Sequence, residues 1–383
     1  MRTLKAALAL LIITLSFLSG QAQTRFDNLE FKQFSTPEGL PNSMVHQVYQ
    51  DRDGYIWIST FYGLFRYDGY EVRTYKSNLY TPGLLVNNNV ICVEEDYSHR
   101  LWIGTHEGLC VLDKQTGKMR KMKLEGISKH RLNEIHVTKD NKVYLGYIRG
   151  MACYNAELDT LELMTSKNCK GEVPEQINIQ TLLEDENGDL LIGTWQDGLF
   201  HYNIKENKFI HYPPLDESNS VLALFQDSKG ALWIGTSGSG LYKVNFSPDK
   251  KILSVEKAYK HDALNTLSLS SDYIYSIHED LQTHSLWLGT RNGVSIMDLT
   301  DEGKFINYRE SGSEHYLPVR EVNTVFRDKN GLMWIGTKGA GVFHVNTRTR
   351  PFEVFYPRGN GKSFTDIIST LYVEESGASW VGF

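Results

Sequence analysis

One tryptophan in the chain stands outside a repeated motif and beside two polar residues that could bind a ligand. Trp195 is followed by Gln196 and Asp197, in a loop predicted between two strands. The flat face of an indole packs well against the C–H groups of a sugar ring, and polar neighbours can take its hydroxyls. These three residues are therefore candidates for binding an oligosaccharide. The alternative is that the Trp195 ring packs beneath the loop.

Positive side chains stand in or near equivalent loops of an otherwise acidic chain. The cationic candidates, with one neighbouring amide, are Arg149, Arg291, Asn292, Arg320 and Lys338. Guanidinium and ammonium groups bind carboxylates and sulfates, so these residues would suit an acidic glycan. The alternative is that they are solvated surface cations. Three further loop residues are weaker candidates: Tyr62, His106 and Glu107.

The sequence does not predict a catalytic centre. Hydrolysis of a glycosidic bond needs two facing carboxyl groups, and the only obvious acids in the candidate loops, Glu107 and Asp197, fall two repeat units apart. The spacing Asp227-x-x-Gly230-x-x-Trp233 also departs from the sialidase box Ser-x-Asp-x-Gly-x-Thr-Trp. No Ser-His-Asp motif or metal-ligand spacing is visible. We predict no catalysis, metal or cofactor here, with a glycosidase or lyase as the less favoured alternative.

The candidate loops follow a segment that recurs along the chain. Its copies, most of which read Trp-Ile-Gly-Thr, begin at Trp57, Trp102, Tyr144, Leu191, Trp233, Trp287, Trp334 and Trp380. A Gly-apolar pair follows each of the first seven copies. An acid precedes each copy, at Asp51, Asp96, Asp140, Asp185, Asp227, Asp280, Asp328 and Glu374. Six of the seven tryptophans stand at this one position, so one structural unit is repeated.

Each unit reads as four short strands separated by polar or glycine-containing turns. Four strands in about 45 residues predict one blade of a β-propeller. The predicted fold class is all-β: a seven-bladed β-propeller of four-stranded blades with the start of an eighth repeat, closed by a strand at Leu29–Phe34. The tryptophans would fill the layers between blades, and the following glycine would leave room for a neighbour's ring. The repeat acids would accept hydrogen bonds from turn amides.

The N-terminus has the pattern of a secretory signal peptide. Arg2 and Lys5 precede the apolar run Ala6–Leu18, and small residues follow it. We predict a signal peptide over residues 1–22, a propeller over 23–350 and an incomplete eighth repeat over 351–383, as in a piece of a longer polypeptide. A short membrane anchor is the alternative for residues 1–22. Export would permit disulfides, and a Cys153–Cys169 bridge is one option.

Composition excludes several broad classes. A hydrophobic fraction of 41% and a charged fraction of 22% are those of a soluble globular protein, not of a disordered or polytopic membrane protein. The formal net charge is −6, which argues against nucleic-acid contact by this region.

The repeat resembles the two-component regulator propeller repeat. The matching pattern is Val-x-x-Ile-x-x-Asp-x-x-Gly-x-Leu-Trp-Ile-Gly-Thr-x-x-Gly-Leu, and its best copies run from Val221 to Leu241, Val322 to Val342 and Val45 to Leu64. The opening segment, Phe34 to Ser43, is similar to the start of the sensor region in hybrid two-component systems of gut-type Bacteroidota. The copies at Tyr144 and Leu191 depart from the pattern because they lack the tryptophan.

The resemblance implies a periplasmic sensor of oligosaccharides. In the family, a second propeller, a small β-sandwich, a transmembrane helix, a histidine kinase, a receiver and a DNA-binding domain commonly follow. The implied partners are an oligosaccharide and the downstream propeller and kinase domains, with a homodimer left open. The alternative is a stand-alone secreted propeller that binds carbohydrate or protein.

Overall fold

The computed structural model describes residues 26, 29–34, 44–78, 85–122, 131–215, 219–247, 250, 253–310, 315–347, 370–373 and 379–382. The chain divides into two compact units, Met1–Arg348 and Thr349–Phe383. All regular structure in the described ranges is β-strand. The predicted signal peptide, the acid Glu374 and most of residues 351–383 lie outside these ranges.

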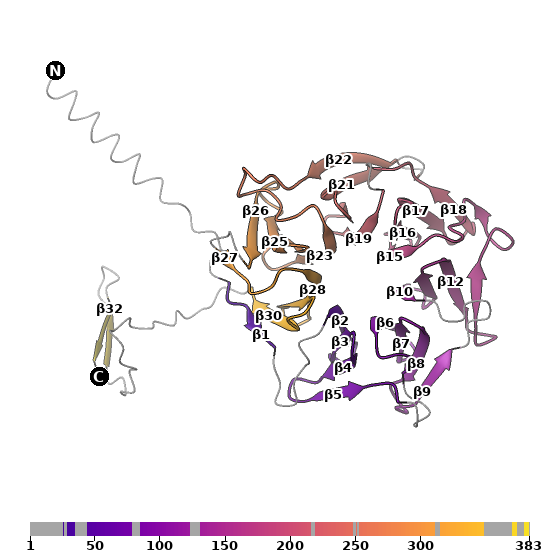
Figure 1. The fold of residues 1–383 in the computed structure, drawn as a ribbon, viewed down its shortest axis with the longest axis horizontal. Coiled ribbons are helices and arrows are strands. Elements are labelled where there is room, and N and C mark those ends of the chain that lie inside the picture. The colour runs from indigo at the N-terminus through magenta and orange to yellow at the C-terminus, as the bar shows by residue number, and fades with distance from the viewer. Residues whose placement is uncertain are drawn as a thin grey trace, which may run out of the picture. The chain divides into compact units, whose positions relative to one another are not determined.

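Seven antiparallel sheets surround a central channel, which confirms the predicted seven-bladed propeller (Figure 1). Blades 1 to 3, each from the inner strand outwards, are β2 (Val45–Gln50), β3 (Ile56–Thr60), β4 (Gly63–Tyr67) and β5 (Val72–Tyr75); β6 (Val90–Glu95), β7 (Arg100–Thr105), β8 (Gly108–Asp113) and β9 (Met119–Met122); β10 (Leu132–Val137), β11 (Val143–Tyr147), β12 (Gly150–Asn155) and β13 (Thr160–Met164).

The remaining blades follow the same order. Blades 4 to 6 are β15 (Ile179–Glu184), β16 (Leu190–Thr194), β17 (Leu199–Asn203) and β18 (Lys208–His211); β19 (Val221–Gln226), β20 (Leu232–Thr236), β21 (Leu241–Phe246) and β22 (Leu253–Tyr259); β23 (Ile274–Asp280), β24 (Ser285–Thr290), β25 (Gly293–Asp298) and β26 (Phe305–Arg309). Blade 7 contains β28 (Val322–Arg327), β29 (Leu332–Thr337) and β30 (Val342–Asn346). Short parallel strands extend blades 4 and 6, namely β14 (Lys170–Gly171) and β27 (His315–Tyr316). The second unit contains one hairpin, β31 (Thr370–Val373) with β32 (Ser379–Gly382).

The ring is closed by a strand from the beginning of the chain. β1 (Lys32–Gln33) pairs antiparallel with β30, and the backbone N–H of Phe34 donates to Val342 O at 2.8 Å. Blade 7 thus takes its outer strand from a segment that precedes blade 1. This confirms the closing strand predicted at Leu29–Phe34.

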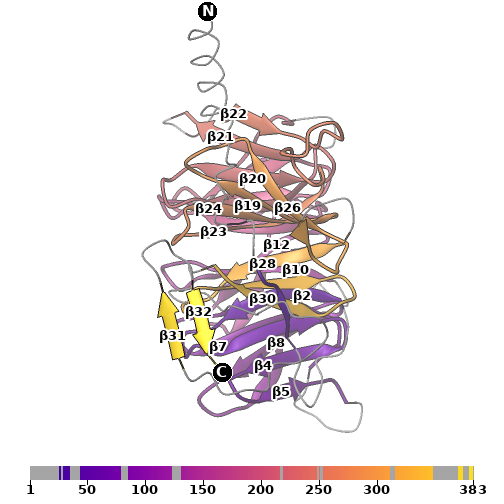
Figure 2. The same cartoon turned by 90° about the vertical axis from the view of Figure 1, so that its left-hand side faces the viewer.

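The repeat tryptophans fill the layers between blades, as predicted. Trp57, Trp102, Trp233, Trp287 and Trp334 are at most 3% exposed. Each packs with aliphatic residues of the next blade round the ring: Trp57 lies with Val90, and Trp334 lies with Val45 across the closure. The view from the edge of the ring shows the blades lying face to face (Figure 2).

The repeat acids do more than hold turns. In blades 1, 2, 5 and 7 one carboxylate oxygen accepts turn amides and the other accepts the indole N–H, at 2.8 Å for Asp51 with Trp57 and 2.9 Å for Asp227 with Trp233. In blade 6 a hydroxyl relay intervenes, since the indole of Trp287 donates to Ser285 Oγ at 3.0 Å. A carboxylate accepts the strongest hydrogen bonds, so this contact fixes both the turn and the ring.

Two blades lack the tryptophan and depart from this arrangement. In blade 3 the hydroxyl of Thr138 accepts the turn amide of Lys142, and Asp140 is exposed. The prediction that Asp140 holds this turn is therefore wrong. In blade 4, Asp185 keeps the turn amides, but its second oxygen lies 3.3 Å from Lys250 Nζ and 4.0 Å from buried His201 Nε2. Without an indole N–H, the buried carboxylate takes other cationic or polar neighbours.

The glycine after Trp-Ile makes room for an aliphatic side chain, not for the aromatic ring that the sequence suggested. A Cβ on Gly235 would lie 2.8 Å from Ile274 Cγ2 of the next blade, and a Cβ on Gly336 would lie 2.6 Å from Val45 Cγ1. All four cysteines are free, so the Cys153–Cys169 bridge is not formed; both thiols border the core cluster of blades 3 and 4.

The indole contact leads to a stability prediction. Trp233→Phe would leave a buried Asp227 carboxylate oxygen without its indole donor. Trp287→Phe would remove one of two partners from the Ser285 hydroxyl, which keeps its hydrogen bond with Thr283 Oγ1 at 2.7 Å. We expect the first variant to lose about 1 kcal/mol more stability than the second, because hydrogen bonds to charged groups are stronger. Urea unfolding of both variants measures the difference, and equal losses would contradict the prediction.

Candidate functional site

Every innermost strand carries a one-residue irregularity at the same place. In each blade the pairing between the first and second strands shifts after the first residue of the innermost strand. A bulge of this kind redirects a side chain out of the sheet's normal alternation. The extra residues all line the central channel: His46, Ile91, Asn133, Gln180, Leu222, Tyr275 and Asn323.

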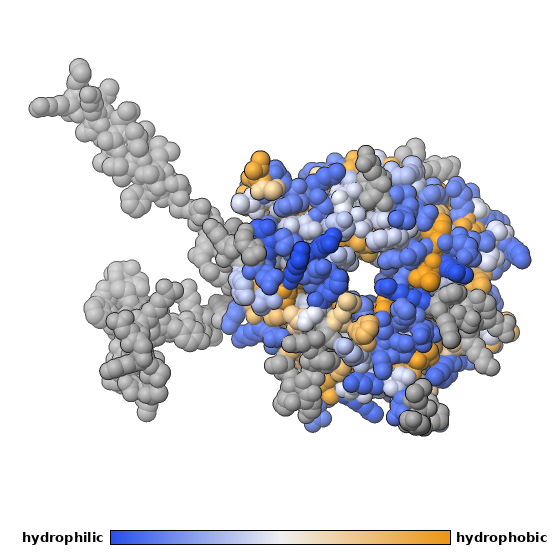
Figure 3. Space-filling model, in the orientation of Figure 1, coloured by the Kyte–Doolittle hydropathy of each residue, from blue (hydrophilic) through white to orange (hydrophobic). Residues whose placement is uncertain are grey.

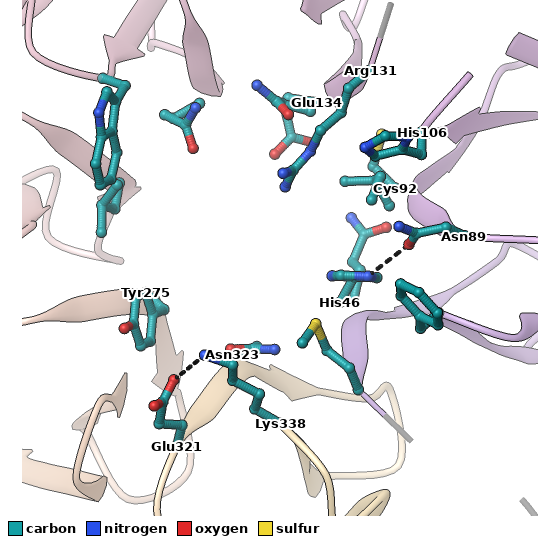
Figure 4. Close-up of a pocket in the computed structure, with 18 residues that line it drawn as sticks. His46, Asn89, Cys92, His106, Arg131, Glu134, Tyr275, Glu321, Asn323 and Lys338 are labelled. Atoms are coloured by element: carbon teal, nitrogen blue, oxygen red, sulfur yellow. Dashed lines mark hydrogen bonds and ion pairs between the residues drawn. The ribbon is translucent and has the colours of Figure 1, made fainter. Parts of the chain in front are cut away.

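A pocket of about 530 Å³ occupies the channel where these residues lie. Side chains from the loops between second and third strands join it, namely Phe61, His106, Trp195 and Lys338. The side chains drawn in Figure 4 surround an open centre, and the labelled ones belong to blades 1, 2, 3, 6 and 7. The space-filling view shows the opening, with hydrophilic residues around much of its rim (Figure 3). The volume is that of a small-molecule site.

The pocket wall is polar, and Arg131 is its one lysine or arginine without an ion-pair partner among the described residues. His46 Nε2 lies 2.9 Å from Asn89 Oδ1, and burial lowers the pKa of His46 to about 4, so the imidazole is neutral. Burial raises the pKa of Glu134 to about 8, so at pH 7 this carboxyl is mostly protonated and can donate a hydrogen bond. Lys338 Nζ is paired with Glu321 at 2.9 Å. Such a wall favours a ligand with many hydroxyls.

Two side-chain amides in the pocket wall are fixed by hydrogen bonds to neighbouring groups. Asn133 Nδ2 donates to Asn178 Oδ1 at 2.8 Å and to Ile179 O at 2.6 Å, and Asn323 Nδ2 donates to Val45 O at 2.9 Å. These bonds fix both amides in the wall. Asn133 Oδ1 is buried and has no hydrogen-bond partner, so an acceptor is left over. A buried acceptor of this kind usually has a partner in water or a ligand.

Two aromatic rings of the pocket remain accessible. Trp195 is 40% exposed and Phe61 is 47% exposed, and both line the pocket. Trp195 is held by its loop, since its backbone N–H donates to Asn178 O at 2.8 Å. The indole therefore does not pack beneath the rim, which was the alternative considered for it.

A second, smaller pocket of about 390 Å³ lies on the rim between blades 5, 6 and 7. Arg291, Asn292 and Arg320 line it, together with His261, Asp272 and Tyr273. The predicted rim residues thus divide into groups. His106, Trp195 and Lys338 line the channel pocket, whereas Tyr62, Glu107, Arg149, Gln196 and Asp197 line neither.

A family model identifies the repeat. The description "Two component regulator propeller" matches residues 39–62, 84–107, 216–238 and 316–339, which fall in blades 1, 2, 5 and 7. The chain carries two-component regulator propeller repeats. The matched ranges cover the innermost strand, the turn and the tryptophan strand of each of these blades.

Similar proteins of known name carry the same kind of propeller. The extracellular domain of the putative hybrid two-component system BT3049 from B. thetaiotaomicron superposes with a TM-score of 0.69 at 23% identity, covering 93% of this chain and 47% of that one. Virginiamycin B lyase from Staphylococcus aureus superposes at 0.61 with 10% identity, covering 83% of this chain and 99% of that one. These likenesses show a shared fold.

One curated protein is similar to a short part of the chain. Histidine kinase P4 from Formosa agariphila is 34% identical over 67 residues, which are 18% of this chain and 5% of that protein. The chain thus spans about half the length of its structural neighbour and matches only a small part of the kinase. Among the described residues no helix is long and apolar enough to cross a membrane, and no group of three metal-ligating side chains occurs.

Three of the residues that the sequence predicts for the site, His106, Trp195 and Lys338, line the channel pocket. Most of the other residues in the pocket wall were not predicted. The prediction chose Tyr62, whereas its neighbour Phe61 lines the pocket and Tyr62 packs edge-on against it at 5.2 Å. The bulge residues carried a signal, because each follows the first apolar residue of an innermost strand and varies in type from blade to blade. The bulge itself could not be read from the sequence.

Proposed function

We propose that this chain is the ligand-sensing propeller of a hybrid two-component regulatory system and that it binds an oligosaccharide at the mouth of the central channel. The main support for this proposal is the channel pocket, in which the accessible indole of Trp195 lies in the same wall as amide and neutral polar groups. Aromatic faces stack on sugar rings, and converging amides bind their hydroxyls.

The proposed setting rests on the repeat family and on the N-terminal pattern. Regulator propeller repeats, a neighbour that is an extracellular domain, and a histidine kinase relative all favour a receptor. The signal-peptide pattern over residues 1–22 favours export to the periplasm. The partners would be the downstream propeller and kinase domains of the same polypeptide, with a second copy of the receptor as a further partner.

In this proposal the propeller recognises and does not catalyse. Ligand binding would change the populations of two arrangements of rigid domains, and the downstream domains would transmit that change. The ring suits this role because its closed, layered core holds the side chains of the channel and rim in place.

A binding measurement tests the proposal. The purified chain is screened on a glycan array, and the affinity for the best glycan is measured by calorimetry. We expect Trp195→Ala to weaken binding at least about tenfold, which is 1.4 kcal/mol, because the stacking surface is lost. Tyr70→Ala is the control, since Tyr70 is 92% exposed and lines neither pocket. Unchanged affinity of the Trp195 variant, or no glycan bound at all, would contradict the proposal.

A further inference from the structure

The second pocket contains two arginines, Arg291 and Arg320, that have no carboxylate partner among the described residues, as is also true of Arg131 in the channel pocket. Arg100, Arg120 and Arg327 each pair with a carboxylate within 2.9 Å. Two guanidinium groups beside one pocket repel each other unless an anion lies between them.

The pocket places hydrogen-bonding groups around these charges. Arg291 lies over the ring of Tyr273, with 4.9 Å from its Cζ to the ring centroid, so the guanidinium has a fixed platform. Asn292 Nδ2 donates to Ser270 O at 3.2 Å, which ties the loop of blade 6 to the wall. A planar guanidinium can bind the oxygens of a carboxylate or sulfate in pairs.

One acid also lines the pocket, and its position leaves the positive charge in excess. Asp272 Oδ1 accepts the backbone N–H of His261 at 2.6 Å. Two arginines against one aspartate give an excess of one positive charge. The His261 ring is held in place because its Nδ1 lies 2.6 Å from the backbone oxygen of Leu269. The second oxygen of Asp272 can accept a sugar hydroxyl beside the anion.

The second pocket adjoins the channel pocket. Arg320 lines the second pocket and the next residue, Glu321, lines the channel. Similarly, Tyr273 lines the second pocket and Tyr275 lines the channel pocket. Two residues along an extended chain span roughly 7 Å. One oligosaccharide can therefore reach both pockets.

We propose that the pocket between blades 5, 6 and 7 is an anion subsite, in which Arg291 and Arg320 bind a carboxylate or sulfate group of the glycan that occupies the channel. The receptor's ligand is then an acidic oligosaccharide. That the anion belongs to a glycan rests on the proposed function, whereas anion binding by the two arginines does not. Of the other predicted rim cations, Lys338 is paired with Glu321 and Arg149 lines neither pocket.

Side-chain nuclear magnetic resonance tests anion binding without knowledge of the glycan. The Nε–Hε signals of the arginines are recorded at mildly acidic pH, where their exchange is slow, and are assigned with Arg291→Gln and Arg320→Gln. The purified chain is titrated with sodium sulfate and with sodium galacturonate, which distinguish the two anion types. Sodium chloride of equal ionic strength and galactose are the controls.

We expect the signals of Arg291 and Arg320 to shift saturably with sulfate, galacturonate or both, while the signal of Arg120, which is paired with Asp159, does not move. In each single variant, the anion concentration that gives half of the remaining arginine's maximal shift should rise at least about tenfold, an effect of 1.4 kcal/mol. Shifts no larger than those with chloride would overturn the anion subsite.

A glycan array separates this inference from the proposed function. The inference predicts that the chain retains carboxylated or sulfated glycans in preference to their neutral counterparts, and that Arg291→Gln with Arg320→Gln removes the preference. Equal binding of neutral and acidic counterparts would overturn the inference and leave the proposed function standing. Saturable anion shifts without any bound glycan would support the anion subsite and contradict the proposed function.

Discussion

Replacing Phe31 and Phe34 together by alanine is expected to lower the free energy of unfolding by about 4 kcal/mol and to loosen the closure of the ring. Phe34 packs at the seam, with ring centroids 4.7 Å from Tyr67 of blade 1 and 5.4 Å from Trp334 of blade 7. Phe31 lies 4.7 Å from Tyr308 of blade 6. Truncating a buried phenylalanine costs about 3–5 kcal/mol, and these half-buried rings should cost about 2 kcal/mol each.

The effect is large because the seam joins the two ends of the ring. A typical domain is stable by only about 5–15 kcal/mol, so the double variant should unfold at clearly lower urea concentration. Lys32→Ala is the matched control, since Lys32 lies in the same strand with an exposed side chain. A double variant that unfolds within about 0.5 kcal/mol of this control would show that β1 does not hold the ring shut.

Gly193→Ala is expected to destabilise the propeller by about 3 kcal/mol. A Cβ at this position would lie 2.6 Å from Thr181 Cγ2 of the same blade and 2.6 Å from Val221 Cγ1 of the next. Neither neighbour can retreat without moving an innermost strand, and overpacking of a dense core costs about 1–3 kcal/mol. The loss should appear in urea unfolding monitored by tryptophan fluorescence.

Blade 1 supplies the control for this prediction, because Ser59 stands where other blades have the glycine. Ser59 is fully buried, and its hydroxyl has no hydrogen-bond partner. Ser59→Ala removes only that hydroxyl, so stability should stay the same or rise by up to about 1 kcal/mol. If Gly193→Ala were as mild as Ser59→Ala, close packing of the blades at the glycine would not be a constraint.

The fold could be predicted because its signals are periodic and local. A tryptophan strand followed by glycine fixes the second strand of a blade, and the spacing of its copies fixes the number of blades. In blade 3 the sequence pattern indicates Asp140 as the turn residue, and this prediction is wrong. Thr138 holds that turn, six residues before Tyr144, at the spacing of Asp51 to Trp57.

The channel wall could not be predicted in the same way, because it depends on how the blades meet. Alternation along a strand decides which side chains face a neighbour, and a bulge changes that alternation at one residue. His46 and Asn133 therefore face the channel for a reason that appears only in the pairing of strands. Rim residues such as Trp195 and Arg291 were found because loop position alone brings them to the channel face.

A crystal structure of the chain with the glycan that it binds most tightly on the array tests oligosaccharide binding at the channel most directly. We expect electron density for the sugar at the channel mouth, with a ring against Trp195 and hydroxyls within hydrogen-bond distance of Asn133 or Glu134. Density for the glycan on the outer strands of the blades, or at the opposite end of the channel, would contradict this expectation.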